Sequence, residues 1–262
     1  MLALIAGRGL LPKEVAARLP ERALICALAG SEPDCVDAEI TFRLEHFGSF
    51  LERLKAAGVT EVCLAGAVTR PQIDPTAIDA ATLPLVPAFQ AALAAGDDGA
   101  LRAVMAILEQ AGFTLRAAHE AAPDLLMGEG VFTRVQPGEL DHADAARGAE
   151  IVAAMSAADI GQSCAVRACQ AIAVENAFGT DWMLHSLSAR PDGEGGLMFK
   201  APKPGQDRRA DLPTIGPETV AAAATAGLSG IVLEAGGVLV LNQEEVIAAC
   251  DRHGLFLWLR PA

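Results

Sequence analysis

The N-terminal half of the chain alternates short apolar runs with segments of helical periodicity. Unbroken apolar runs at 2–6, 23–29 and 62–65 predict three strands. Strands that are apolar on both faces are typical of a parallel sheet covered by helices on each side. The helices expected with these strands cover about 12–19, 50–58 and 98–112, with Pro12 in the first turn of one and Asp98 as the cap of another. This half is therefore predicted to be an α/β domain.

The pattern changes after about residue 120, where Pro and Gly residues gather over 121–140. We place a domain boundary there, which gives domains 1–130 and 131–262. Helices are expected at about 142–157, 180–188, 217–227 and 242–253, the second capped by Thr180 or Asp181 and the last opened by a capping box of Asn242 and Glu245. Strands are expected at about 165–168, 171–175, 197–200, 231–233, 238–241 and 256–259. The second half is therefore predicted to be a separate α/β domain.

The composition of the chain argues against several classes of function. Lys and Arg number 20 against 33 Asp and Glu, a net charge of −13, which argues against a general nucleic-acid binder. No apolar run is long enough to span a bilayer, and the N-terminus lacks the basic region of a signal peptide. The six cysteines form no C-x-x-C pair, which indicates a reduced, cytosolic protein rather than a disulfide framework or a zinc site.

Two glycine-containing turns follow predicted strands in the first half. Gly7 and Gly9 precede Pro12, where a helix N-terminus offers N–H groups to a phosphate. Proline replaces the last glycine of the dinucleotide fingerprint, so a nicotinamide cofactor is poorly supported, and a plain tight turn is the alternative. Gly66 opens the second turn, in which Arg70 is either a phosphate ligand or an ordinary surface arginine.

Charged residues suggest two further sites. Asp97 and Asp98 are either helix-capping residues or ligands of a divalent cation. In the second half, the proline-rich segment 200–216 places Lys200 and Lys203 before Asp211 in an otherwise acidic chain. Such cations neutralise phosphate charge, and an aspartate beside them can hold a metal or orient a water. A solvated surface loop is the alternative explanation.

A set of motifs in order along nearly the whole chain resembles one family. The motifs are 5–12, 66–71, 96–98, 118–120, 159–162, 179–181, 200–204 and 211–216. Together they resemble the two-domain, magnesium-dependent UDP-2,3-diacylglucosamine pyrophosphatases of lipid A synthesis. The resemblance implies a Rossmann-like N-terminal domain with a parallel sheet and a separate C-terminal α/β domain. It also implies hydrolysis of the pyrophosphate to UMP and 2,3-diacylglucosamine 1-phosphate, with water attacking the phosphorus on the sugar side.

The resemblance places the family's key acidic residue at Asp211, and the other roles are hypotheses built around that position. Asp211 is expected to be the central catalytic residue, which binds Mg²⁺ or positions the water, and Lys200 and Lys203 are expected to assist it. Further expected metal ligands are Asp97, Asp98 and Asp181. The expected substrate-binding residues are Gly7, Gly9, Leu10, Pro12, Gly66, Arg70, Gln162, Thr180 and Thr214. Ala67 and Phe178 depart from the family pattern, which more often has Asn and a polar residue there.

The expected partners are the lipid-linked nucleotide sugar and its lipid product, without nucleic acid. A homodimer is expected, with transient contact to the cytoplasmic face of the inner membrane. Two alternatives remain open at this stage. A nicotinamide-dependent oxidoreductase would explain the glycine turn but not Pro12 or the basic loop. A non-enzymatic nucleotide or lipid-intermediate binding protein would need neither a metal nor Asp211.

Overall fold

The computed structural model describes residues 1–69, 71–94, 96–191, 193–205, 207–209 and 212–261, except for the side chains of 92–98. The chain forms two compact units. The N-terminal unit comprises Met1–Pro123 and is joined by Asp207–Arg209 from the second half of the sequence. The C-terminal unit comprises the rest of the chain from Asp124 onward.

A five-stranded parallel sheet forms the centre of the N-terminal unit, in the order β3-β2-β1-β4-β5. Its strands are β1 Leu2–Ala6, β2 Leu24–Leu28, β3 Ile40–Phe42, β4 Glu61–Ala65 and β5 Thr114–Leu115. The chain runs outward from β1 to β3 on one side and from β4 to β5 on the other. Ligands bind beyond the carboxyl ends of the strands at such a reversal, so β1 and β4 mark a candidate site.

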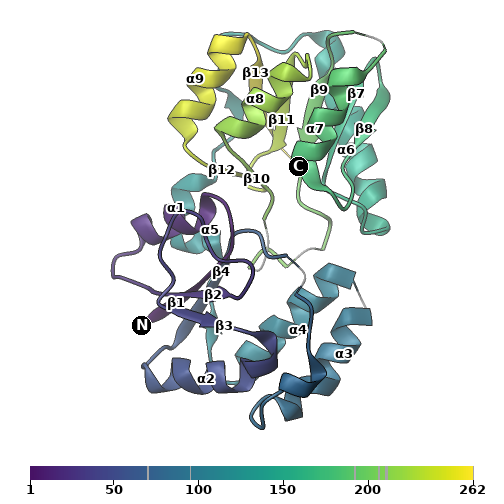
Figure 1. The fold of residues 1–262 in the computed structure, drawn as a ribbon. Helices are drawn as coiled ribbons and strands as arrows, with labels where there is room; N and C mark the ends of the chain where they lie inside the picture. The colour runs from purple at the N-terminus through teal and green to yellow at the C-terminus, as the bar shows by residue number, and fades with distance from the viewer. Residues whose placement is uncertain (70, 95, 192, 206, 210–211, 262) are drawn as a thin grey trace. The chain divides into compact units, whose positions relative to one another are not determined.

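Helices cover both faces of this sheet (Figure 1). They are α1 Leu11–Arg18, α2 Phe47–Ala56, α3 Val86–Ala94, α4 Gly96–Gln110 and α5 Ala118–Ala121. Helices α2 and α4 supply one face of the core, where Phe42 and Phe50 stack with ring centroids 3.9 Å apart. Helices α1 and α5 pack against each other and against β4 on the other face. The predicted parallel sheet is therefore confirmed.

The C-terminal unit contains a six-stranded mixed sheet in the order β6-β13-β11-β9-β7-β8. Its strands are β6 Gly130–Val131, β7 Ser163–Arg167, β8 Gln170–Val174, β9 Leu197–Lys200, β11 Gly230–Glu234 and β13 Phe256–Arg260. Strands β9, β11 and β13 are parallel, whereas β6, β7 and β8 run antiparallel to their neighbours. A separate pair of short parallel strands consists of β10 Thr214–Ile215 and β12 Leu239–Val240.

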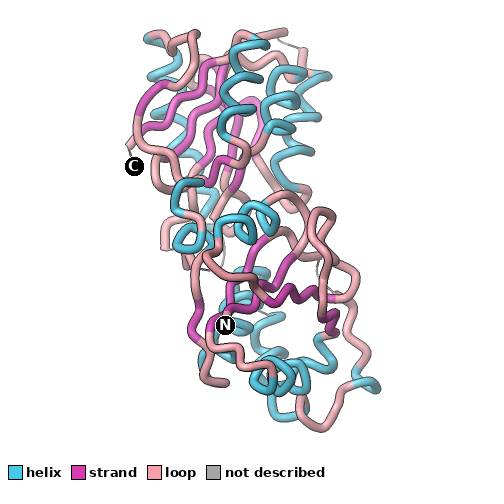
Figure 2. The backbone as a smooth tube through the Cα atoms, turned by 90° about the vertical axis from the view of Figure 1, so that its left-hand side faces the viewer, coloured by secondary structure: helices cyan, strands magenta, loops and turns pink. Residues whose placement is uncertain are grey.

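Alternate residues of these strands belong to two different cores. Phe199 faces α6 Glu139–Ala157, while its neighbour Met198 belongs to the core with the other helices. Those helices are α7 Gly179–Ser186, α8 Pro217–Thr225 and α9 Gln243–His253. Figure 2 shows the strands of this unit in magenta with helices on both sides. The alternation follows from the two-residue period of a strand.

Several local predictions are wrong. Thr180 lies inside α7, whose N-cap is Phe178, and Asp181 also lies inside this helix. Asn242 is the N-cap of α9 in a left-handed conformation, but its side chain makes no capping hydrogen bond. Asp98 lies within α4 rather than before it, because that helix begins at Gly96. The structure also contains β3, α3 and β5, which the apolar pattern did not predict.

The boundary between the two units falls between Pro123 and Asp124. The proline-rich segment 200–216 is divided between the two units. Asp207–Arg209 groups with the N-terminal unit, whereas the preceding Lys200 and Lys203 belong to the C-terminal unit. In the part of the chain that is described, no helix combines the length and apolarity needed to cross a bilayer.

Candidate functional site

The turns after β1 and β4 are bound to each other by backbone hydrogen bonds. The Gly7 N–H donates to the Ala65 carbonyl at 2.8 Å, and Arg8 and Ala67 exchange N–H···O bonds at 2.9 and 3.0 Å. A Cβ on Gly7 would lie 2.4 Å from the Ala67 oxygen, and Gly66 has a φ of +94°. Close approach of the two turns therefore requires both glycines. The N–H of Gly7 is consequently occupied and cannot serve a phosphate.

Two other glycine N–H groups near the strand ends bind carboxylates of the protein itself. The Gly9 N–H, at φ +90°, donates to Asp34 Oδ2 at 3.1 Å. The Gly30 N–H donates to both carboxylate oxygens of Glu32, at 3.0 and 3.1 Å, which lowers the pKa of Glu32. These backbone donors have the geometry to bind an anion. A phosphate that reaches Gly9 must displace Asp34.

Helix α1 begins directly after Gly9, with Leu10 as its N-cap and Pro12 in its first turn. The side chain of Leu10 makes no capping hydrogen bond, and Pro12 is buried. The sequence therefore places these expected binding residues at a helix N-terminus, where an anion is stabilised.

A cavity of about 310 Å³ opens beyond the carboxyl ends of β2 and β3. Its lining residues belong to three segments of the chain, at or after the ends of β2, β3 and β4. The lining residues are Leu28, Ala29, Gly30, Ser31, Arg43, Leu44, Glu45, Thr69, Pro71 and Gln72. The buried Ser31 hydroxyl accepts the Thr69 N–H at 2.9 Å, and Arg8 donates to the Gly30 carbonyl at 2.9 Å. This cavity is a candidate binding site that the sequence did not reveal.

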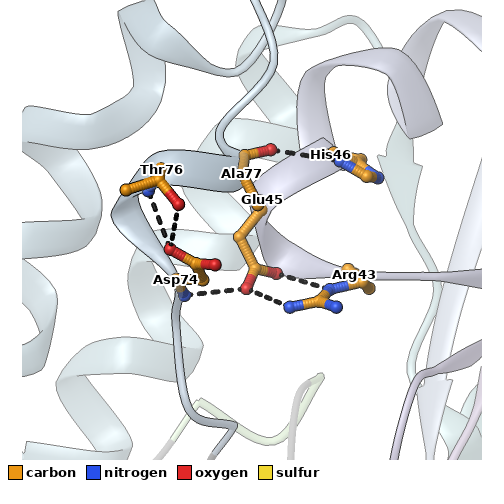
Figure 3. A network of polar contacts seen from close by, with 6 residues as sticks. All are labelled: Arg43, Glu45, His46, Asp74, Thr76 and Ala77. Atoms are coloured by element: carbon orange, nitrogen blue, oxygen red, sulfur yellow. Dashed lines mark hydrogen bonds and ion pairs between the residues drawn. The ribbon is translucent and has the colours of Figure 1, made fainter.

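Glu45, one of the lining residues, is a buried carboxylate. Figure 3 shows the polar contacts that it makes. Glu45 is only 3% exposed and accepts two hydrogen bonds from Arg43, at 2.7 and 3.2 Å. It also accepts the Asp74 N–H at 2.9 Å, while its own backbone carbonyl accepts the Asp79 N–H. The hydrogen bonds from Arg43 outweigh burial and lower the pKa of Glu45 to about 2. Glu45 therefore holds the segment 74–79 beside the end of β3 as a carboxylate.

In the C-terminal unit, three predicted site residues come together with a fourth that was not predicted. Lys200 ends β9 and is 6% exposed, and its Nζ donates to Thr180 Oγ1 at 2.8 Å. Ser163, at the start of β7, donates to the same hydroxyl oxygen at 3.5 Å. Gln162 precedes Ser163, and its backbone carbonyl accepts the Ala201 N–H at 3.1 Å. We call Gln162, Ser163, Thr180 and Lys200 the lysine cluster.

The lysine cluster suits an anionic ligand. Burying an ammonium is costly unless polar or negative groups surround it. Among the described residues, Gln162 Oε1 is buried and has no hydrogen-bond partner. The Lys200 ammonium can donate to the oxygen atoms of a phosphate. The Gln162 oxygen is an acceptor and needs a donor group of a ligand instead.

The other predicted residues of this unit occupy separate environments. Lys203 forms an ion pair with Asp159, so its charge is already compensated. Asp181 is exposed on the first turn of α7. Thr214 belongs to β10 and lies opposite Leu239 of β12. Sequence alone did not indicate these differences in environment.

The basic segment 207–209 is attached to the N-terminal unit. Arg209 binds both carboxylate oxygens of Asp207, at 3.0 and 2.7 Å, and donates to Glu109 of α4 at 2.7 Å. These bonds raise the pKa of Arg209 and lower that of Asp207. On α5, burial and the charge of Arg208 lower the pKa of His119, whose Nδ1 is buried without a partner among the described residues. The bond from Arg209 to Glu109 therefore attaches the chain shortly before position 211 to α4.

The predicted metal ligands are only partly described. Asp211 and Arg70 lie outside the described residues, and so do the side chains of Asp97 and Asp98. Where side chains are described, no three His, Cys, Asp or Glu residues gather as a metal site. Of the expected ligands, only Asp181 can be placed, and one carboxylate does not make a magnesium site. The described side chains alone therefore do not make up a magnesium site.

These features define a two-unit α/β protein with a Rossmann-like parallel sheet and a second sheet that carries a buried lysine at a strand end. Comparison with known proteins is more specific. The family model described as the LpxI N-terminal domain matches residues 1–125, and the LpxI C-terminal domain model matches residues 128–258. The chain therefore belongs to the LpxI family, which confirms the resemblance found in its motifs.

A curated relative covers nearly the whole molecule. The chain is 37% identical over 270 residues to the UDP-2,3-diacylglucosamine pyrophosphatase LpxI of Caulobacter vibrioides. The match spans 98% of this chain and 96% of that protein. Both units of this chain therefore have counterparts in the relative.

Proposed function

We propose that this protein hydrolyses the pyrophosphate of UDP-2,3-diacylglucosamine to UMP and 2,3-diacylglucosamine 1-phosphate in lipid A synthesis. The observation that carries the proposal is the near full-length match, at 37% identity, to a protein with that activity. In the reaction, water forms a bond to the phosphorus on the sugar side. The bond from that phosphorus to the bridging oxygen breaks, and UMP leaves with the bridging oxygen.

The lysine cluster supports a role in this reaction. The buried Lys200 ammonium offsets negative charge on the phosphate oxygens, and charge that develops in the transition state is where fixed electrostatic groups contribute most. Thr180 orients the ammonium through the 2.8 Å hydrogen bond. Lys203, which forms an ion pair with Asp159, is proposed to assist Lys200.

Asp211 is assigned the central role of positioning the attacking water. This assignment rests on the motif resemblance, and the anchoring of Arg209 to Glu109 supports it by holding the chain two residues away. Mg²⁺ is proposed as the cofactor, because a divalent cation neutralises the charge of a pyrophosphate. Asp97, Asp98, Asp181 and Asp211 are its proposed ligands.

The nucleotide is proposed to bind the N-terminal unit, at the turns after β1 and β4 and in the adjoining cavity. Expected binding residues there are Gly9, Leu10, Pro12 and Arg70, while Gly7 and Gly66 act by letting the two turns approach. The substrate and product are lipids, so we propose transient contact with the cytoplasmic face of the inner membrane. A homodimer is proposed as the assembly.

The proposal is tested by incubating the protein with UDP-2,3-diacylglucosamine and Mg²⁺ and identifying both products by mass spectrometry. We expect UMP and 2,3-diacylglucosamine 1-phosphate in equal amounts, and no product in EDTA or with Asp211→Ala. Glu52→Ala is a matched control, because it removes an exposed carboxylate from α2 and should leave turnover unchanged. Substrate binding without turnover by the wild type, across several divalent metals, would instead support a binding protein.

A further inference from the structure

Helix α6 ends in a turn that holds an aspartate in a left-handed backbone conformation. Asp159 follows the C-cap residue Ala158 and has a φ of +51°. Its N–H donates to the Ser156 carbonyl, and the next N–H, that of Ile160, donates to the Met155 carbonyl, each at 3.1 Å. This pair of hydrogen bonds defines a Schellman motif, in which glycine is the preferred residue at the position that Asp159 occupies.

Three other helices of the chain end in the same motif with glycine at that position. Helices α2, α4 and α8 are followed by the same two hydrogen bonds, and their left-handed residues have φ values of +77°, +96° and +68°. These residues are Gly58, Gly112 and Gly227. An aspartate tolerates this conformation less well than glycine, because its Cβ crowds the backbone. Asp159 therefore lowers the local stability relative to glycine.

The charge of Asp159 is also unfavourable at the end of a helix. A helix C-terminus carries partial negative charge, which a basic residue stabilises and a carboxylate destabilises. All residues in the last turn of α6 are described, and none is basic. The carboxylate instead forms an ion pair with Lys203, in which the two side chains are 47% and 24% exposed. Because such exposed pairs stabilise a protein only slightly, the choice of aspartate points to a functional reason.

The surrounding backbone determines where Asp159 and Lys203 meet. The Ala201 N–H donates to the Gln162 carbonyl at 3.1 Å, which ties the start of the proline-rich segment to the residues that follow α6. A proline on each side of Lys203 restricts its backbone, whereas its long side chain is flexible unless a partner holds it. A lysine ammonium has three N–H donors, so Lys203 can bind the Asp159 carboxylate and a phosphate at once.

We propose that Asp159 is a positioning residue, whose carboxylate holds the Lys203 ammonium in place to donate to the pyrophosphate. The inference rests on the proposed function, in which Lys203 assists Lys200. An ammonium that is fixed in advance contributes more to catalysis, because it need not be reoriented as charge develops in the transition state. Asp159 acts through Lys203 and is assigned no contact with the substrate.

Stability and activity measured together separate this role from a structural one. Asp159→Gly supplies the residue preferred in the turn and removes the carboxylate, so it should raise the midpoint of thermal unfolding while kcat falls about fivefold. Asp159→Asn tolerates the left-handed conformation without the charge, so it should lower kcat equally. KM should change less than about twofold in both variants, because the contribution is made in the transition state.

The same helix offers a matched control. Glu150→Gln removes a carboxylate from the exposed ion pair with Arg147 on α6, and it should leave kcat unchanged. Unchanged kcat in the two Asp159 variants would overturn the proposal. A joint fall of thermal stability and kcat in Asp159→Gly would also overturn it, because the carboxylate would then be needed for the fold.

A double-mutant cycle tests whether Asp159 acts through Lys203. In a Lys203→Met background, Asp159→Asn should change kcat no further. A second fall, as large as that in the wild-type background, would overturn the proposal, because Asp159 would then act independently of Lys203.

Nuclear magnetic resonance gives a readout that does not depend on turnover. The chain has four lysines, so ¹³C labelling at lysine Cε introduces four probes, and Lys203→Met identifies the Lys203 signal. We expect the order parameter of Lys203 Cε to fall in Asp159→Asn, while that of the exposed Lys13 stays unchanged. Equal order of Lys203 in wild type and variant would overturn the proposal. If the wild type turned over no substrate, the proposed function would fail, whereas this measurement would still decide whether Asp159 holds Lys203.

Discussion

Replacement of Glu45 by Gln should destabilise the N-terminal unit in a way that depends on pH. The carboxylate is 3% exposed, and its pKa falls from 4.5 to about 2 in the folded protein. Each pKa unit corresponds to about 1.4 kcal/mol, so the shift has an upper value of about 3 kcal/mol. Solvent screens the partner, because the Arg43 side chain is 51% exposed, and we therefore expect a loss of about 2 kcal/mol for Glu45→Gln at neutral pH.

The sign of the pH dependence follows from the lowered pKa. A carboxylate with a lowered pKa stabilises the folded state above its unfolded pKa, here about 4.5, and this contribution is lost as the pH falls toward about 2. The difference in the free energy of unfolding between the wild type and Glu45→Gln should therefore disappear between about pH 5 and pH 2. The matched comparison is the same variant at neutral pH.

The assay must report on the N-terminal unit, because both tryptophans lie in the C-terminal unit. Hydrogen–deuterium exchange along a urea gradient resolves peptides that cover Arg43–Glu45 and the Asp74 amide, which donates to Glu45. Peptides from β11 serve as an internal reference. If the difference in unfolding free energy between wild type and variant stayed constant from neutral to acidic pH, the stabilisation by the ionised Glu45 carboxylate would be refuted.

Three further outcomes are expected. Thr180→Val should lower kcat/KM about tenfold by removing the hydroxyl that orients Lys200, and Thr180→Ser should restore it; wild-type kinetics for the valine variant would contradict the assigned role. Gly7→Ala should lower stability by about 2 kcal/mol, because its Cβ would lie 2.4 Å from Ala67 O, whereas Gly128→Ala, with no heavy atom within 4 Å, should melt like the wild type. A thiol reagent should label Cys35 and Cys169 quickly, because they are exposed, while burial that raises the pKa to about 12 should protect Cys26, Cys63, Cys164 and Cys250 until unfolding; rapid labelling of all six would be inconsistent with the packing.

The architecture of the N-terminal unit was predictable because its main strands are buried on both faces. An unbroken apolar run such as Leu2–Ala6 predicts a buried strand when turns and helical segments flank it. Strand β3 has only three residues, with Thr41 exposed between two buried neighbours, so it carries too little periodic signal. Its existence depends on pairing with β2, which is a tertiary contact.

The candidate site was only partly predictable for a similar reason. Lys200 and Thr180 were each predicted to be site residues from their motifs. Their hydrogen bond depends on how α7 and β9 pack, which the sequence does not specify. Capping by Thr180 was a wrong prediction because α7 already begins at Gly179, and the Thr180 hydroxyl binds Lys200. Glu45 was missed because a carboxylate after a short strand looks like any surface residue until Arg43 and the Asp74 amide are brought to it.

Water is proposed to attack the pyrophosphate at the phosphorus on the sugar side. Turnover of UDP-2,3-diacylglucosamine in ¹⁸O-labelled water, followed by mass spectrometry of both products, locates the attack. We expect one labelled oxygen in 2,3-diacylglucosamine 1-phosphate and none in UMP. Label in UMP would refute the proposed site of attack, and the absence of both products would refute the proposed reaction.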